Sequence, residues 1–137
     1  MSSDTTANYY FNTNDGNSVT FNNGFVFVAG TANRYFQYGT TSSGITTDLS
    51  RFKGHQLKME CDVTAITGRV RLSLWEYGNG SFTQQPSSAY ISDTASSPLS
   101  VSLTNPVSDS CTRIYVRINL ENANDTVTVK NLKVYPI

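Results

Sequence analysis

The sequence predicts an all-β protein in which two antiparallel sheets pack face to face. Short segments of alternating apolar and polar residues recur along the 137 residues, and no stretch with a helical period exceeds about two turns. Turn-forming residues separate these segments at the ~8–12-residue spacing of β-sandwiches. A chain of this length fits one domain with one core. We expect that domain over residues 8–137, after a disordered tail of residues 1–7.

The first expected elements are a hairpin, a third strand and one helical turn. Residues 18–22 and 24–28 flank an Asn-Asn-Gly sequence, and Asn-Gly is the strongest short signal for a hairpin. A further strand is expected over 34–38. Residues 48–52 favour a single helical turn, which the side chain of Asp48 is expected to cap.

Two longer alternating strands follow. Successive side chains on a strand point to opposite faces. Residues 56–65 therefore place four apolar side chains on one face, namely Leu57, Met59, Cys61 and Val63. A Thr-Gly turn then leads to residues 69–77, whose core-facing side chains are Val70, Leu72 and Leu74. The opposite face of that strand carries Arg69, Arg71, Ser73, Trp75 and Tyr77.

The last third of the chain predicts further strands over 89–91, 99–103, 112–120 and 126–135. In 112–120 the core-facing residues are Ile114, Val116, Ile118 and Leu120, and the outward ones are Arg113, Tyr115, Arg117 and Asn119. In the final strand Leu132 and Val134 break the alternation that Val127 and Val129 begin. This break predicts a β-bulge near residues 130–131.

The two cysteines are expected to be free thiols. Cys61 lies on a core face of its strand, whereas Cys111 has the opposite parity to Ile114 if its strand is unbroken. A disulfide needs Cβ atoms that face each other. Pairing of the two cysteines is the alternative that the sequence leaves open.

Composition excludes several classes of partner. Ten basic and ten acidic residues give a net charge of +0, so no charge excess favours nucleic acid or an anionic membrane. No apolar run approaches the ~18 residues that span a bilayer. Charged residues are only 15% of the chain, and Ser, Thr and Asn supply the polarity beside 8 Tyr and 7 Phe. This balance is typical of extracellular β-domains and of surfaces that recognise hydroxylated ligands.

The outward face of residues 69–77 is the first candidate site. It combines the single Trp of the chain, Trp75, with Tyr77 and with Arg71. Large aromatic side chains on a solvated face cost hydration free energy. We therefore expect that a ligand or another part of the chain covers them.

Two segments resemble jelly-roll carbohydrate-binding modules of the family 4, 9 and 22 type. Residues 47–63, TDLSRFKGHQLKMECDV, are similar to the passage in which a loop and a glycine lead into an alternating strand. Residues 127–135, VTVKNLKVY, are similar to the final strand of these modules. The likeness extends from about Asn17 to the end of the chain.

The resemblance implies a convex sheet and a concave sheet that binds a polysaccharide. Strands 56–65, 99–103 and the final strand would lie in the convex sheet, and strands 69–77, 89–91 and 112–120 in the concave one. The implied carbohydrate-binding residues are Arg71, Trp75, Tyr77, Tyr90, Tyr115, Arg117 and Asn119. Parity alone turns all of these except Tyr90 away from the core.

The chemistry of these side chains suits sugars. An indole covers the C–H face of a pyranose, burying area at ~25 cal/mol per Å². Arg71, Arg117 and Asn119 supply hydrogen-bond donors, and the two arginines also suit an anionic saccharide such as a phosphate-bearing wall polymer. An open cleft binds weakly, so we expect a Kd between about micromolar and millimolar.

Modules of this kind also occur as host-binding domains of phage tails and baseplates. The first residues show neither the basic region nor the apolar core of a signal peptide. We therefore expect an extracellular or virion protein that is part of a larger chain or of a virion assembly, with a bacterial cell-wall saccharide as ligand.

The alternative is a structural or assembly domain of a fibre or tail. The exposed aromatics, Trp75 and Tyr115 among them, would then lie in a subunit interface. In a purely structural reading, the loop of residues 78–82 covers Trp75, and loops or a second subunit cover Tyr90 and Tyr115. Arg71 and Arg117 would form ordinary ion pairs, with Glu76, Glu121 or Asp93 as the available carboxylates.

We expect no enzymatic activity and no cofactor. The single histidine is His55, and no serine has the context of a nucleophile elbow. A glycosidase needs two carboxylates across a cleft, whereas Glu60 and Asp62 lie on one strand as solvated charges. Asn131 stands where related modules often place an aspartate that binds calcium, so a structural calcium is left open.

Overall fold

A computed structural model describes residues 9–21, 23–39 and 41–137. The first sheet contains β1 (Tyr9–Phe11), β4 (Tyr35–Tyr38), β6 (Val70–Gly78), β7 (Ser81–Gln84) and β9 (Cys111–Leu120). The second contains β2 (Ser18–Phe21), β3 (Phe25–Val28), β5 (Leu57–Thr67), β8 (Leu99–Ser102) and β10 (Thr126–Pro136). The predicted tail, residues 1–7, lies outside the described residues.

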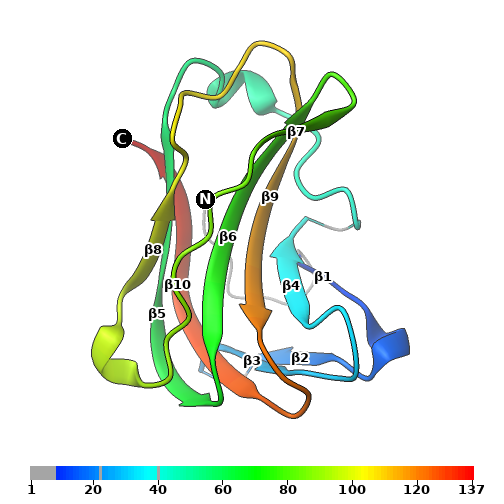
Figure 1. Ribbon diagram of the computed structural model, residues 1–137, viewed down its shortest axis with the longest axis vertical. Coiled ribbons are helices and arrows are strands. Elements are labelled where there is room, and N and C mark those ends of the chain that lie inside the picture. Colours follow the sequence, from blue (N-terminus) through cyan, green and yellow to red (C-terminus); the bar gives the residue numbers. More distant parts are fainter. Residues whose placement is uncertain (1–8, 22, 40) are drawn as a thin grey trace.

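The strand orders are β1-β4-β9-β6-β7 and β2-β3-β10-β5-β8, and the strand pairs are antiparallel. Figure 1 shows β6 and β9 side by side, with β4 and β1 beyond β9 and with β5, β8 and β10 in the other layer. The predicted all-β, two-sheet antiparallel sandwich is confirmed. The predicted division of the strands between the sheets is also observed, since 56–65, 99–103 and the final strand fall in one sheet and 69–77 and 112–120 in the other.

The core lies between the sheets and uses the apolar faces that parity predicts. The inward side chains of β5 and β9 are at most 4% exposed: Leu57, Met59, Cys61, Val63, Ile114, Val116, Ile118 and Leu120. Full burial of one such side chain stabilises the fold by roughly 1.5–3 kcal/mol. The alternation of these two long strands therefore fixes which face of each sheet remains free for function.

The predicted hairpin and bulge are both present. β2 pairs with β3 from Ser18 opposite Val28 to Phe21 opposite Phe25, and Asn22 in the turn lies outside the described residues. The pairing of β10 with β5 shifts register between Lys130 and Lys133. Asn131 adopts a φ of 54° there, which returns Leu132 and Val134 to the core.

Two local predictions were wrong: the capping role of Asp48 and the strand over residues 89–91. The helical turn exists as a short 3₁₀ helix, η3 (Leu49–Arg51), but the side chain of Asp48 makes no capping hydrogen bond. A capping residue has an extended backbone, whereas Asp48 is left-handed, with φ 56° and ψ 30°. Two further 3₁₀ helices, η2 (Thr13–Asp15) and η4 (Thr94–Ser96), lie at other turns.

Residues 89–91 do not form a regular strand. They belong to an irregular edge segment, residues 86–91, which runs beside β6 through isolated bridges of Ser87 with Ser73 and Ile91 with Val70. Pro86 has no N–H to give to a ladder. The Ser88 hydroxyl accepts from the Leu72 N–H at 3.0 Å in place of a backbone carbonyl. A side-chain hydroxyl thus takes the place of one backbone acceptor in the pairing of this segment with β6.

Both cysteines are buried and free, as predicted. A register shift between Tyr77 and Gly78 in the pairing of β6 with β9 turns Cys111 inward. Burial raises the pKa of the Cys61 thiol to about 12, so this thiol stays protonated at physiological pH. None of the helices in the described residues is long and apolar enough to cross a membrane.

Candidate functional site

Strand register brings six of the seven predicted binding residues onto one surface. β6 and β9 pair with Arg71 opposite Asn119, Trp75 opposite Tyr115 and Tyr77 opposite Arg113. Residues directly opposite each other on neighbouring strands share a face. We call this outer surface the arginine–aromatic face, formed by Arg71, Trp75, Tyr77, Arg113, Tyr115, Arg117 and Asn119.

Tyr90, the seventh predicted residue, reaches the same surface from the irregular edge segment. The guanidinium carbon of Arg71 lies 4.8 Å from the centre of the Tyr90 ring, and that of Arg69 lies 5.0 Å away. This is cation–π geometry. Tyr90 therefore extends the arginine–aromatic face beyond the edge of β6.

Arg117 occupies the centre of the face and is held among three rings. Its guanidinium carbon is 4.2 Å from the ring centre of Tyr35 and 4.8 Å from those of Trp75 and Tyr115. Burial lowers the pKa of Arg117 from its ordinary value, yet an arginine stays charged at neutral pH. A partly desolvated cation is thus fixed next to the indole.

Gln37 of β4 anchors Arg117, and the sequence reading missed it. The Arg117 Nε donates to Oε1 of Gln37 at 2.7 Å. Gln37 is fully buried, and its Nε2 donates to the backbone carbonyls of Thr41 and Ser42. The short strand β4 gives no functional signal by itself. The contact arises because Gln37 lies opposite Arg117 in the β4–β9 pairing.

Phe82 is the second residue that the sequence reading missed. It lies on β7 with 42% of its surface exposed. Its ring contacts Trp75 at 5.6 Å and Tyr77 at 5.2 Å edge-on, and Tyr115 at 5.6 Å. The β6–β7 hairpin thus partly covers Trp75, as the alternative reading expected, but the indole remains partly exposed.

Tyr115 supports the face from below. It is only 5% exposed, and Phe82 and Arg117 lie against its ring. Gly44 packs closely against the Tyr115 ring, since a Cβ at Gly44 would lie 3.2 Å from a ring carbon. Arg113 stacks on Tyr77 at 4.7 Å and donates to the Tyr115 hydroxyl at 3.2 Å.

Asn119 is partly engaged within the face. Its Nδ2 donates to the Ser73 hydroxyl at 2.9 Å, and that hydroxyl lies 2.8 Å from the hydroxyl of Ser87. Ser73 is fully buried beneath these contacts. This chain of short polar side chains ties the centre of β6 to β9 and to the irregular edge segment.

Two buried donors on the face have no acceptor among the described residues. They are the indole Nε1 of Trp75 and the guanidinium Nε of Arg71. A buried donor without a partner costs about 1–3 kcal/mol, so each such group in a native structure calls for an explanation. Because both atoms are covered by the protein, the donors that the face offers to a ligand are the terminal guanidinium nitrogens of Arg71 and Arg117, which donate to no described residue.

The carboxylates that were expected to neutralise the arginines are used elsewhere. Glu121 pairs with Arg69 at 3.0 Å. Glu76 is on the inner side of β6, 1% exposed. Asp93 caps η4 by accepting from the Ala95 N–H at 3.1 Å. Within the described part of the chain, neither Arg71 nor Arg117 has an ion-pair partner within 4.0 Å.

Glu76 is held by a network of its own. It accepts from the Thr83 hydroxyl at 2.7 Å, from Gln84 Nε2 at 3.0 Å and from the Ser108 N–H at 2.7 Å. Burial alone raises the pKa of Glu76, but these hydrogen bonds outweigh it and hold the pKa below its ordinary value. Glu76 thus ties β6 to β7 and to the loop before β9.

The other acidic pair lies on the outer side of the second sheet. Glu60 pairs with Lys133 at 3.0 Å, and Asp62 accepts from Asn131 Nδ2 at 2.7 Å. They border a hollow of about 480 Å³. Among the described residues, no three His, Cys, Asp or Glu side chains gather as metal ligands. Both carboxylates of this hollow are therefore engaged by side chains of the neighbouring strand β10.

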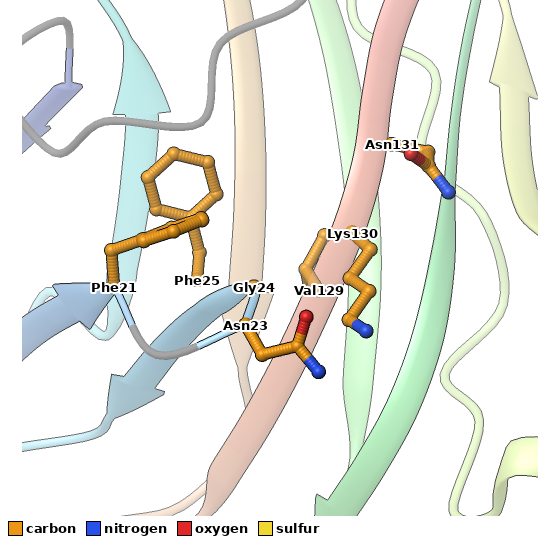
Figure 2. Close-up of a pocket in the computed structure, with 7 residues that line it drawn as sticks. All are labelled: Phe21, Asn23, Gly24, Phe25, Val129, Lys130 and Asn131. Carbon is orange, nitrogen blue, oxygen red and sulfur yellow. The ribbon is translucent and has the colours of Figure 1, made fainter.

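A smaller cavity of about 150 Å³ lies where the β2–β3 turn meets the bulge of β10. Figure 2 shows the rings of Phe21 and Phe25 on one side of it and Lys130 extending along β10 toward Asn23. This volume is below the ~300–1,000 Å³ of typical small-molecule sites. Among the described residues, the arginine–aromatic face is the better candidate, because partly exposed rings lie there beside arginines that have no carboxylate partner.

Comparison of the chain with family models, with curated proteins and with solved structures finds no match in any of the three.

Proposed function

We propose that this protein is a non-catalytic carbohydrate-binding domain and that its ligand lies on the arginine–aromatic face. One observation carries the proposal. Trp75 offers a partly exposed ring, and the Arg117 guanidinium 4.8 Å from its centre has two terminal nitrogens that donate to no described residue. A sugar supplies both complements, since its C–H face covers a ring and its hydroxyls accept hydrogen bonds.

Placement of the neighbouring donors supports the same ligand class. Arg71 and Trp75 are four residues apart on one face of β6, about 13 Å at the rise of a strand. Arg117 and Asn119 lie between and beside them on β9. An extended row of donors beside a ring suits an oligosaccharide more than a compact small molecule.

The biological setting that we propose is host adhesion by a phage tail, with a bacterial cell-wall polysaccharide as ligand. The support is the composition: little charge, many Ser, Thr and Asn, and a net charge of +0. A neutral polar surface avoids nonspecific electrostatic attachment. Recognition then depends on the one face where cations and rings are concentrated.

The test is a labelled copy applied to a glycan array and to intact bacterial cells. Trp75→Ala is expected to abolish retention while the protein still unfolds cooperatively. Tyr135→Ala is the matched control, because Tyr135 is a half-buried aromatic residue on the second sheet. Unchanged retention of Trp75→Ala would reject the site, and no retention of the parent chain on any glycan or cell would reject the function.

A second candidate is an assembly domain, favoured by the 42% exposure of Phe82. In that case a second subunit would cover Phe82 and Trp75. Light scattering would then give an oligomer that Phe82→Ser dissociates, and Trp75 would be shielded from a soluble quencher only at concentrations where the oligomer forms. The arginines without a carboxylate partner favour the saccharide, because an apolar interface gives their N–H groups no acceptor.

A further inference from the structure

The arginine–aromatic face carries an unusual local balance of charge. Arg71, Arg113 and Arg117 all lie on it. In the described part of the chain, the ion pairs within 4.0 Å are Arg69–Glu121 and Lys133–Glu60, so none of these three guanidinium groups has a carboxylate partner. The whole chain is nevertheless neutral. Positive charge is therefore concentrated on one surface.

The arginines hold fixed positions around the indole. Tyr115 lies directly opposite Trp75, so Arg113 and Arg117 occupy the two positions diagonal to Trp75 on β9. Arg117 is likewise diagonal to Arg71, at the ~7–8 Å spacing of diagonal neighbours. Cations and rings thus alternate along β9 every second residue, about 7 Å apart.

The guanidinium groups are preorganised, and much of their donor capacity is free. Arg117 uses its Nε on Gln37, and no described residue accepts from its two terminal nitrogens. Arg71 stacks on Tyr90, and its guanidinium donates to no described residue. An arginine fork binds the paired oxygens of a phosphate or a carboxylate with matched geometry. Stacking on rings fixes the planes of both groups before a ligand arrives.

We propose that the ligand of this face is an anionic saccharide, whose sugar ring lies on Trp75 and whose phosphate or carboxylate groups are bound by Arg71 and Arg117. This inference rests on the proposed function and adds the charge of the ligand. A neutral sugar would leave two neighbouring, partly buried cations without a counter-charge. A phosphate or carboxylate between them removes their mutual repulsion and accepts from their free N–H groups.

Nucleic acid is the competing polyanion, since its bases also stack on rings. It is disfavoured because Lys and Arg together number only 10 and are balanced by 10 acidic residues. Nucleic-acid surfaces need an excess of basic charge over a long backbone track. Here the face carries three arginines, and one of them, Arg117, contacts the indole.

The experiment measures quenching of Trp75 fluorescence, which is specific because the chain has one Trp. Four probes are titrated: polygalacturonate, its methyl ester, glucosylated poly(glycerol phosphate) and single-stranded DNA. The first and third separate carboxylate from phosphate, and the methyl ester is a neutral copy of the first. We expect at least about tenfold tighter binding to one anionic saccharide than to the methyl ester, and this preference should fall with added salt.

The variants assign that preference to the arginines. Arg71→Gln and Arg117→Gln should each weaken binding to the anionic polymer by about tenfold or more. Arg51→Gln, an exposed arginine of η3 outside the face, should not. Arg71 is half-buried and makes no protein hydrogen bond, so Arg71→Gln tests the proposal even if Arg117→Gln fails to fold.

Four results would overturn the inference. Equal binding to the methyl ester would make the ligand neutral, and undiminished binding by both arginine variants would reject Arg71 and Arg117 as the groups that bind the anion; either result leaves the proposed function standing. Tighter binding to DNA than to either anionic saccharide would replace the ligand class. No binding to these polymers, to the glycan array or to cells would reject the proposed function together with the inference.

Discussion

Arg117 and Gln37 face each other across β9 and β4, joined by a hydrogen bond of 2.7 Å between the guanidinium Nε and the amide Oε1. A cation without a carboxylate is thus positioned by a neutral amide. The amide in turn is fixed by two loop carbonyls. The central charge of the arginine–aromatic face is therefore oriented but not neutralised.

Gln37→Met should uncouple this arrangement. The change keeps the side-chain volume but removes the acceptor of Arg117 and the donor to the loop, so we expect a loss of about 1–3 kcal/mol in the free energy of unfolding. Urea denaturation measures it. Gln85→Met, at an exposed position, is the control. Equal stability of the two variants would contradict a positioning role for Gln37.

Phe82→Ala should increase the exposure of Trp75, because the Phe82 ring lies edge-on against the indole. The emission of the single Trp should shift to longer wavelength, with a loss of about 1 kcal/mol in stability since Phe82 is itself partly exposed. Phe21→Ala removes a similarly exposed ring, 49% exposed, that lies elsewhere. It should leave the emission unchanged.

Glu76 should make the free energy of unfolding depend on pH in the acid range. Its pKa is lowered in the folded state, so its contribution is complete above the unfolded pKa of about 4.3 and is lost as the pH falls through the folded value. The stability difference between the parent and Glu76→Gln should be about 1–3 kcal/mol at neutral pH and should shrink toward pH ~3. Thr104→Ser, an exposed substitution that changes no titratable group, should show no such trend.

The two thiols should report on unfolding. Cys61 and Cys111 are buried and free, and burial raises the pKa of both. A thiol reagent should therefore label neither in the native protein and both in denaturant, with mass spectrometry counting the adducts. Rapid native labelling, or a mass two protons lower without reductant, would contradict this arrangement.

Much of the fold follows from local periodicity, because a strand has only two faces. The alternation in residues 112–120 predicts both the buried Ile114 and the outward Arg117. A two-residue turn at Asn79 and Gly80, both with positive φ, also carries the signal that predicts a hairpin. β7 was missed because its four residues offer little apolar alternation.

Local periodicity does not predict which contacts form between strands that are far apart in the sequence. Gln37 becomes part of the face through pairing across 80 positions of sequence, and Phe82 by folding back over β6. The burial of Tyr115 depends on the approach of Gly44. Parity states which way a side chain points, but only the assembled sheets determine what covers it.

The irregular edge beside β6 also governs how copies of this chain meet. A newly arriving strand would find Pro86, which has no N–H, and Ser88, whose hydroxyl already satisfies the Leu72 amide. That border of the sheet cannot be extended by simple backbone pairing. This side of the sheet is therefore a poor template for sheet-to-sheet pairing with a second copy of the chain.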